Sequence, residues 1–257
     1  MKATIIAGGI GERLYPITKI LNKHLLLIYN KPMIFYQISF LILCGFRKFL
    51  IIVINKETET QIKRILPENF KNKIDISFQI QKKPNGIPGA MKLSKEFFKD
   101  QKQKVFLLGD NFFYGNGLPS QIISEIKKKI PTIFTQKVDN NKSFGVILKK
   151  KGKNYFIEKP NKSIKAPAIT GFYIFDEKLF NFINKLKPSK RNELEVINII
   201  KEYEKNNSLN IIELKQGVVW FDLGTFDNIF LCSEFVKIIE KRQGIEIGNL
   251  SQILKRI

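Results

Sequence analysis

A short apolar run that leads straight into a glycine-rich turn constrains the fold of this chain more than any other feature. Residues 2–7, KATIIA, are typical of a buried strand, and Gly8, Gly9 and Gly11 follow directly. Because glycine has no Cβ atom, its backbone N–H groups can curl around an anion, and such a turn carries partial positive charge. The pattern predicts an anion-binding turn between a strand and the next segment.

Two basic side chains follow the glycine turn. Arg13 adds a planar fork of five hydrogen-bond donors, and Lys23 adds a compact positive charge. The glycine spacing differs from the dinucleotide pattern GxGxxG, and the stretch does not end in the Gly-Lys-Ser/Thr of a phosphate loop. Judged from these residues alone, an ordinary strand-to-helix turn with two surface cations explains the stretch equally well.

Strand and helix patterns alternate through the first half of the chain. The predicted strands are residues 2–7, 49–54, 74–81, 105–108 and 132–138, and the predicted helices are residues 33–44, 57–66, 89–99 and 121–129. This alternation predicts an α/β fold with a doubly wound, mostly parallel, Rossmann-like sheet. Ligands of such sheets bind beyond the carboxyl ends of the strands, which is where the glycine turn and Asp110 fall.

The second half has shorter strands, which we expect to form a β-rich lobe folded onto the sheet. The predicted elements here are strands 145–148, 155–158, 171–175 and 209–215 and helices 193–205 and 228–241. No linker composition separates the two halves. We therefore expect one domain over residues 1–225, with a core and a β-rich lobe, followed by a helical tail over residues 226–257.

The charge of the chain is strongly positive. Lysine and arginine number 44 against 23 aspartates and glutamates, which gives a net charge of +21. Such an excess suits phosphate or nucleic-acid partners. The lysines, however, are spread along the chain, and the clusters at 127–129 and 149–153 fit a helix end and a hairpin turn. Because no nucleic-acid-binding motif accompanies them, we expect no nucleic-acid partner.

Length and composition favour a globular protein of the cytoplasm. The 257 residues are 44% hydrophobic, which is enough for a sizeable core. No apolar run approaches the roughly 18 residues of a membrane span, and the start MKATII lacks the features of a secretory leader. Cys44 and Cys232 lie far apart in apolar surroundings, so we expect buried thiols without a metal. These features predict neither a membrane partner nor export.

Several polar residues at predicted strand ends suit the chemistry of nucleotides. Asp110 ends a buried strand, where a carboxylate commonly binds Mg²⁺ and phosphates, although it can also simply form a turn. Gln81 has an amide that matches the O4 and N3–H edge of thymine or uracil, and Gly86 lets backbone approach a base. A glutamine before a Pro-Asn-Gly turn is also common without any function.

Taken together, the motifs resemble those of the sugar-1-phosphate nucleotidylyltransferase family, and most closely its thymidylyltransferase branch. The matching stretches are GGIGERLYPIT together with Lys23, LGDNFFYG, QKKPNG, EKP, TGFY, LKPSKRNELE and VVWFDLGT. They stand in the family's order and cover about residues 2–248. The resemblance implies a cytoplasmic enzyme of nucleotide-sugar biosynthesis that joins dTTP and glucose 1-phosphate into dTDP-glucose and pyrophosphate. It also implies a homo-oligomer.

The resemblance assigns a role to each matching residue. It implies catalytic roles for Arg13 and Lys23 and a Mg²⁺ site at Asp110 and Asp222. It implies nucleotide binding by Gly8, Gly9, Gly11, Gln81 and Gly86, and sugar-phosphate binding by Gly145, Glu158, Lys159, Tyr173 and Arg191. Taken alone, Asp222 is also explained as the cap of a turn, and Glu158-Lys159 before a proline as the end of a strand. We expect a structural role for the lone histidine, His24, because a phosphate nucleophile needs no base.

The chain departs from the family pattern at several places. These are Leu27, the stretch 87–89, Asn198, Leu223 and a C-terminal end shorter than usual. Alternatives therefore stay open: the same reaction with UTP or another nucleotide, a nucleotide-sugar binding protein that has lost turnover, or a basic nucleic-acid binder.

Overall fold

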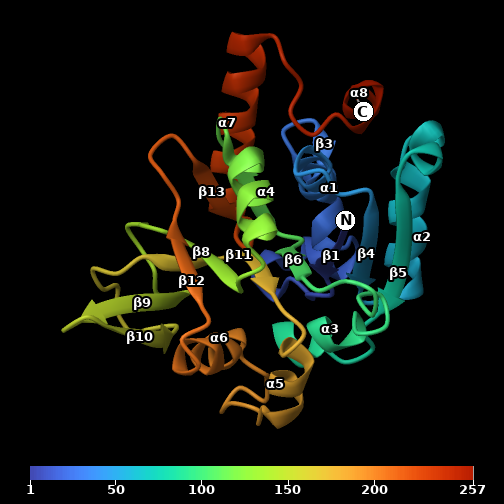
Figure 1. Ribbon diagram of the computed structural model, residues 1–257. Coiled ribbons are helices and arrows are strands. Elements are labelled where there is room, and N and C mark those ends of the chain that lie inside the picture. Colours follow the sequence, from blue (N-terminus) through green and yellow to red (C-terminus); the bar gives the residue numbers. More distant parts are fainter. Residues whose placement is uncertain (257) are drawn as a thin grey trace.

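Four parallel strands form the centre of the computed structural model, which describes residues 1–256. They are β1 (Lys2–Ala7), β4 (Lys48–Val53), β5 (Asp75–Ile80) and β6 (Lys104–Leu108), and they lie in the order β6-β1-β4-β5 (Figure 1). β1, β4 and β6 are apolar almost throughout, which suits strands covered on both faces, whereas β5 alternates between exposed and partly buried residues. The expected doubly wound, mostly parallel sheet is confirmed.

An antiparallel half extends this sheet. β11 (Ala168–Phe175) pairs with β6 and also with β8 (Thr132–Gln136) and β9 (Gly145–Lys150). β10 (Lys153–Glu158) closes one edge, and β12 (Asn210–Glu213) runs parallel to β8. The expectation that these strands fold onto the sheet is wrong. They continue the same sheet, because β11 pairs directly with the central strand β6.

Helices cover both faces of the sheet. On one face lie α1 (Met33–Leu43), α2 (Lys56–Ile65), α4 (Leu118–Lys128) and α8 (Leu250–Lys255), and on the other lie α3 (Ile87–Leu93), α5 (Leu179–Lys185) and α6 (Val196–Lys205) (Figure 1). Successive strand residues alternate between these two cores, as Ile5 and Ile6 of β1 do. Both faces of the central strands are therefore apolar.

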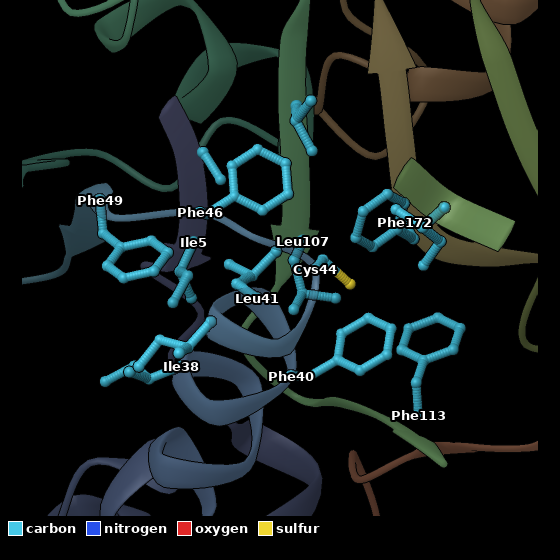
Figure 2. Close-up of a cluster of buried hydrophobic side chains, with 14 of the residues drawn as sticks. Ile5, Ile38, Phe40, Leu41, Cys44, Phe46, Phe49, Leu107, Phe113 and Phe172 are labelled. Carbon is cyan, nitrogen blue, oxygen red and sulfur yellow. The ribbon is translucent and has the colours of Figure 1, made fainter. Parts of the chain in front are cut away.

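Three phenylalanine rings connect α1 to the neighbouring strands β7 (Asn111–Tyr114) and β11. Phe40 of α1 stacks on Phe113 at a centroid distance of 5.5 Å, and Phe172 of β11 meets both rings at 6.1 and 6.2 Å (Figure 2). Each ring buries a large apolar area, and edge-to-face pairs add to that. These contacts hold the segment after β6 against the sheet.

Two short ribbons were not expected from the sequence. β7 (Asn111–Tyr114) pairs antiparallel with β13 (Val219–Asp222), and β2 (Leu27–Ile28) pairs with β3 (Lys31–Pro32). The 3₁₀ turns, also unpredicted, are Glu12–Leu14, Ile17–Lys19, Lys23–Leu25 and Glu68–Asn72. Strands of two to four residues carry too little periodicity to be recognised.

One predicted helix is displaced. Instead of residues 89–99, α3 covers Ile87–Leu93, because Gly86 caps its start and Pro88 sits in its first turn. It ends where the hydroxyl of Ser94 donates to the carbonyl of Met91. The stretch that follows forms turns rather than helix.

The C-terminal part packs on the rest of the chain. α7 (Phe226–Gln243) buries Cys232 and Val236 in a third apolar cluster with Ile28 and Phe112, and α8 packs against α1. The thiols of Cys44 and Cys232 are free and buried, as expected. Among residues 1–256, no helix combines the length and the apolar character needed to cross a membrane.

Candidate functional site

Two adjoining cavities lie where β1, β5 and β6 end. The larger has a volume of about 540 Å³ and the smaller about 200 Å³, and Arg13, Asp110 and Lys159 line both. Of the predicted residues, the larger is lined by Gly8, Gly9, Gly11, Arg13, Lys23, Gln81, Gly86, Asp110 and Lys159. The smaller is lined by Arg13, Asp110, Gly145, Glu158, Lys159, Tyr173, Arg191 and Asp222. The structure thus brings every predicted ligand residue into one cleft, while their roles stay predictions.

The glycine turn forms one wall of the larger cavity. Gly11 adopts a left-handed conformation, with φ of 77°, and its carbonyl accepts a hydrogen bond from the hydroxyl of Thr18 at 2.8 Å. A Cβ atom on Gly8 would lie only 2.5 Å from Oε1 of Gln81. The glycines therefore permit both the shape of the turn and its close contact with the end of β5.

A short ion pair lies at the centre of the cleft. The Nζ atom of Lys23 is 2.5 Å from Oδ2 of Asp110, and both side chains are largely buried. Burial acts to raise the pKa of Asp110, but the neighbouring ammonium of Lys23 outweighs it and holds that pKa well below its usual range. Asp110 is therefore ionised in the folded protein.

The β7–β13 ribbon brings a second carboxylate beside the first. Asp222 pairs in register with Asn111, and the N–H of Leu223 donates to the carbonyl of Asp110 at 2.7 Å. Burial and the negative charge of Asp110 raise the pKa of Asp222 to about 6. Its nearest counter-charge is Arg13, whose Nη2 lies 3.7 Å from Oδ2 of Asp222. The two cations match the two carboxylates in number, but Arg13 lies farther from Asp222 than Lys23 lies from Asp110, so the charge of Asp222 is less closely compensated.

This carboxylate pair suits a divalent cation that takes few protein ligands. Mg²⁺ usually binds one or two carboxylates and completes its octahedron with water and substrate phosphates. Within residues 1–256, no group of three or more histidine, cysteine, aspartate or glutamate side chains could hold a metal. Asp110 and Asp222 thus fit Mg²⁺ in the presence of a phosphate substrate, and do not form a complete protein cage.

Asn111 holds this arrangement together, and the sequence did not single it out. Its Oδ1 accepts from Nε1 of Trp220 at 2.6 Å and from the N–H of Gly171 at 2.9 Å. Its Nδ2 donates to Oδ1 of Asp110 at 3.0 Å. The only sequence signal was its place directly after Asp110. Because its side-chain bonds reach β11 and β13, Asn111 fixes the carboxylate relative to both.

In the smaller cavity, Arg191 is surrounded by acidic groups. Its Nη2 lies 2.8 Å from Glu195, 3.4 Å from Glu158 and 3.8 Å from Glu193. Burial and the charge of Glu195 raise the pKa of Glu158. The charge of Arg191 is therefore matched within the protein. Glu193 and Glu195, which sequence reasoning did not nominate, also line the cleft.

Lys159 differs from the other cations of the cleft. It follows β10 with a left-handed backbone, φ of 43°, and its N–H donates to the carbonyl of Phe144. It is exposed, and it makes no ion pair with any residue in the range 1–256. An unmatched ammonium where the two cavities meet can bind an anion that reaches into both.

His24 packs beneath the cleft and does not open onto it. Its Nδ1 donates to Oδ1 of Asn22 at 2.8 Å, and a Cβ on Gly109 would lie 2.7 Å from the imidazole. Burial and the charge of Lys23 lower the pKa of His24 to about 3. The imidazole is neutral and enclosed, which agrees with the expected structural role.

Gly224 is a further residue that the sequence reasoning passed over. A Cβ atom there would lie 2.2 Å from Nη2 of Arg13 and 3.2 Å from Oδ1 of Asp222. The absence of a side chain lets the guanidinium approach the carboxylate. The signal was present in the stretch DLGT, where the glycine follows Asp222 by two positions.

Comparisons with known proteins identify the family of the chain. The family model described as nucleotidyl transferase matches residues 2–238. The chain therefore belongs to the nucleotidyl transferase family. It is similar to the curated glucose-1-phosphate thymidylyltransferase of Neisseria meningitidis, 35% identical over 100% of this chain and 89% of the relative. It is also similar to that of Mycolicibacterium smegmatis, 32% identical over the same shares.

Solved structures show the same architecture. A structure from Bacillus anthracis, described as a glucose-1-phosphate thymidylyltransferase in complex with a sucrose, superposes with a TM-score of 0.80 at 33% identity, over 91% of this chain and 95% of that one. A UDP-glucose pyrophosphorylase complexed with UDP-glucose reaches a TM-score of 0.77 at 22% identity, over 92% and 98%. The latter likeness concerns the fold alone.

Proposed function

We propose that this protein transfers a thymidylyl group from dTTP to glucose 1-phosphate, with dTDP-glucose and pyrophosphate as products. The observation that carries the proposal is the junction of two cavities of unequal size at Arg13, Asp110 and Lys159. A nucleoside triphosphate fits the larger cavity, a hexose phosphate fits the smaller, and their phosphates meet at the junction. The names of the relatives support this pair of substrates.

Each residue of the cleft has a role that follows from its position. The N–H groups of the glycine turn and the guanidinium of Arg13 hold the β- and γ-phosphates, and Lys23 stabilises negative charge at the α-phosphate. Lys159 orients the phosphate of the sugar. One oxygen of that phosphate bonds to the α-phosphorus while the bond from the α-phosphorus to the bridging oxygen breaks, and pyrophosphate leaves. Catalysis of this kind rests on positioning and charge.

We assign Asp110 and Asp222 as the residues that would hold Mg²⁺. Their carboxylates lie beside the junction of the cavities, and the raised pKa of Asp222 is consistent with a missing positive charge. When bound, the ion would neutralise developing charge on the phosphates.

We also propose that the chain works as a homo-oligomer in the cytoplasm, with residues 1–225 as its catalytic domain. α7 leaves a stripe of large apolar side chains exposed, which a second copy of the chain would cover; they are Phe226, Phe230, Leu231 and Ile238. The two free thiols fit a reducing compartment.

Pyrophosphate release tests the proposed function. The assay contains Mg²⁺ and glucose 1-phosphate and runs in parallel with dTTP, UTP, CTP, ATP and GTP. We expect release with dTTP well above release with the other nucleotides. Preferential release with UTP would support the same reaction but with UTP as the nucleotide substrate. Absence of release from a folded sample that still binds a nucleotide would contradict catalysis.

Replacing Lys159 with alanine should chiefly impair the use of the sugar phosphate. Because the side chain of Lys159 makes no ion pair within residues 1–256, its ammonium is available to the substrate, and its loss should raise KM for glucose 1-phosphate about tenfold or more. KM for dTTP should change much less. Lys162→Ala, an exposed lysine three residues further on, is the matched control. Unchanged kcat and KM in Lys159→Ala would remove the residue from the site.

A further inference from the structure

The side-chain amide of Gln81 presents its oxygen to the larger cavity. Gln81 is 6% exposed, and its Nε2 donates to Oδ1 of Asn85 at 3.2 Å. Its Oε1 lies beside Gly8 at the start of the glycine turn. Within residues 1–256 this oxygen accepts no hydrogen bond, yet it is not sealed from the cavity. It is therefore an acceptor without a partner that is available to a ligand.

Three contacts hold Asn85 in the position from which it binds Gln81. Its carbonyl accepts from the N–H of Leu194 at 2.9 Å. Its side chain lies over Gly89, where a Cβ atom would be 1.8 Å from Oδ1. Its Oδ1 accepts a hydrogen bond from Nε2 of Gln81. Asn85 itself is exposed and is not part of the cavity lining, so it acts through Gln81 and not on a ligand directly.

The direction of this hydrogen bond decides which way the Gln81 amide faces. An amide carries two donors on nitrogen and acceptors on oxygen, and the two ends can exchange by rotation. If the Gln81 amide rotated by half a turn, its oxygen would face the Oδ1 of Asn85, and two acceptors would oppose each other. With its own amide in this orientation, Asn85 disfavours rotation of the Gln81 amide alone and keeps an acceptor toward the cavity.

We propose that Asn85 is a specificity-determining residue that makes the cleft select bases with a ring N–H. This inference rests on the proposed function, which makes the larger cavity the nucleotide site. Thymine and uracil carry a hydrogen on N3 that the oxygen of Gln81 can accept. The N3 atom of cytosine is itself an acceptor, so it would oppose that oxygen. A polar site discriminates strongly when the wrong ligand leaves its groups unpaired.

Equilibrium binding of dTTP, UTP and CTP tests the inference without requiring turnover. The proteins are the wild type, Asn85→Ala, Asn85→Ser, whose side chain is too short to reach Gln81, and Asn85→Asp. Lys83→Ala, on an exposed neighbour, is the matched control. Pyrophosphate release is measured on the same samples, so that binding and catalysis are judged separately.

We expect Asn85→Ala and Asn85→Ser to reduce the preference for dTTP over CTP about tenfold, the effect of one hydrogen bond. Asn85→Asp should keep the preference, because an aspartate offers only acceptors to Gln81. The ratio of dTTP to UTP affinity should stay constant in all variants, since both bases present the same edge. Lys83→Ala should match the wild type.

Three results would overturn the inference. The first is an unchanged preference for dTTP over CTP in both Asn85→Ala and Asn85→Ser. The second is an equal weakening of all three nucleotides, which would indicate damage to the loop. The third is an equal loss of preference in Asn85→Asp. Selective binding by the wild type without any turnover would contradict the proposed function alone, and failure to bind any nucleotide would contradict both.

Discussion

Asp110→Asn is expected to lower kcat by about a thousandfold or more, because a metal-binding carboxylate stabilises the transition state by several kcal/mol. Asp110 lies at the junction of both cavities, and Lys23 keeps its carboxylate ionised. The asparagine has a similar shape and retains an oxygen toward Lys23, so the fold should persist. The measurement is pyrophosphate release over a titration with Mg²⁺.

The control for this variant is Asp139→Asn, which removes an exposed carboxylate that lines neither of the two cavities. Its activity should match that of the wild type. Thermal unfolding of both variants checks that they are folded. Activity of Asp110→Asn within a few-fold of the wild type at saturating Mg²⁺ would refute the assignment of the metal site to Asp110.

Arg13→Ala is expected to lower kcat by about a hundredfold to a thousandfold, the usual cost of losing one preorganised donor to a developing negative charge. The guanidinium of Arg13 lines both cavities and lies 3.7 Å from Asp222. Arg13→Lys should recover only part of the loss, because an ammonium cannot replace the planar fork. Steady-state kinetics with dTTP and glucose 1-phosphate measure both effects.

Gly224→Ala tests the role of Arg13 independently. This variant keeps the arginine but forces its guanidinium out of position. The added Cβ would come within 2.2 Å of Nη2 of Arg13, so kcat should fall, though by less than in Arg13→Ala. Arg64→Ala, on the exposed side of α2, should behave as the wild type. Full activity of Arg13→Ala would show that the guanidinium is not part of the catalytic machinery.

The central sheet could be predicted because its strands are long and apolar. β1, β4 and β6 stand out as buried runs, and the glycine turn and Asp110 follow two of them directly. Knowing that these strand ends meet at one edge of the sheet was sufficient to place both in one cleft. The motifs then nominated most of the other cleft residues, although not Glu193, Glu195 or Gly224.

What could not be predicted depends on contacts between distant segments. β13 has four residues and no alternation, so nothing local indicated that it pairs with β7. The sequence likewise gave no sign that Arg191 is enclosed by glutamates or that Asn85 holds Gln81. These features arise from the tertiary structure, where propensity and periodicity carry no information.

The β7–β13 ribbon also bears on the timing of biosynthesis. The side chains of Asn111 and Trp220, which meet across it, are 109 residues apart in the chain. At the usual pace of translation, about 5–20 residues per second, the ribosome needs roughly 5–20 s to supply the second half of the ribbon. Until then Asp110 lacks its partner carboxylate. A nascent chain therefore passes through a period in which the sheet can form but the paired acidic centre does not yet exist.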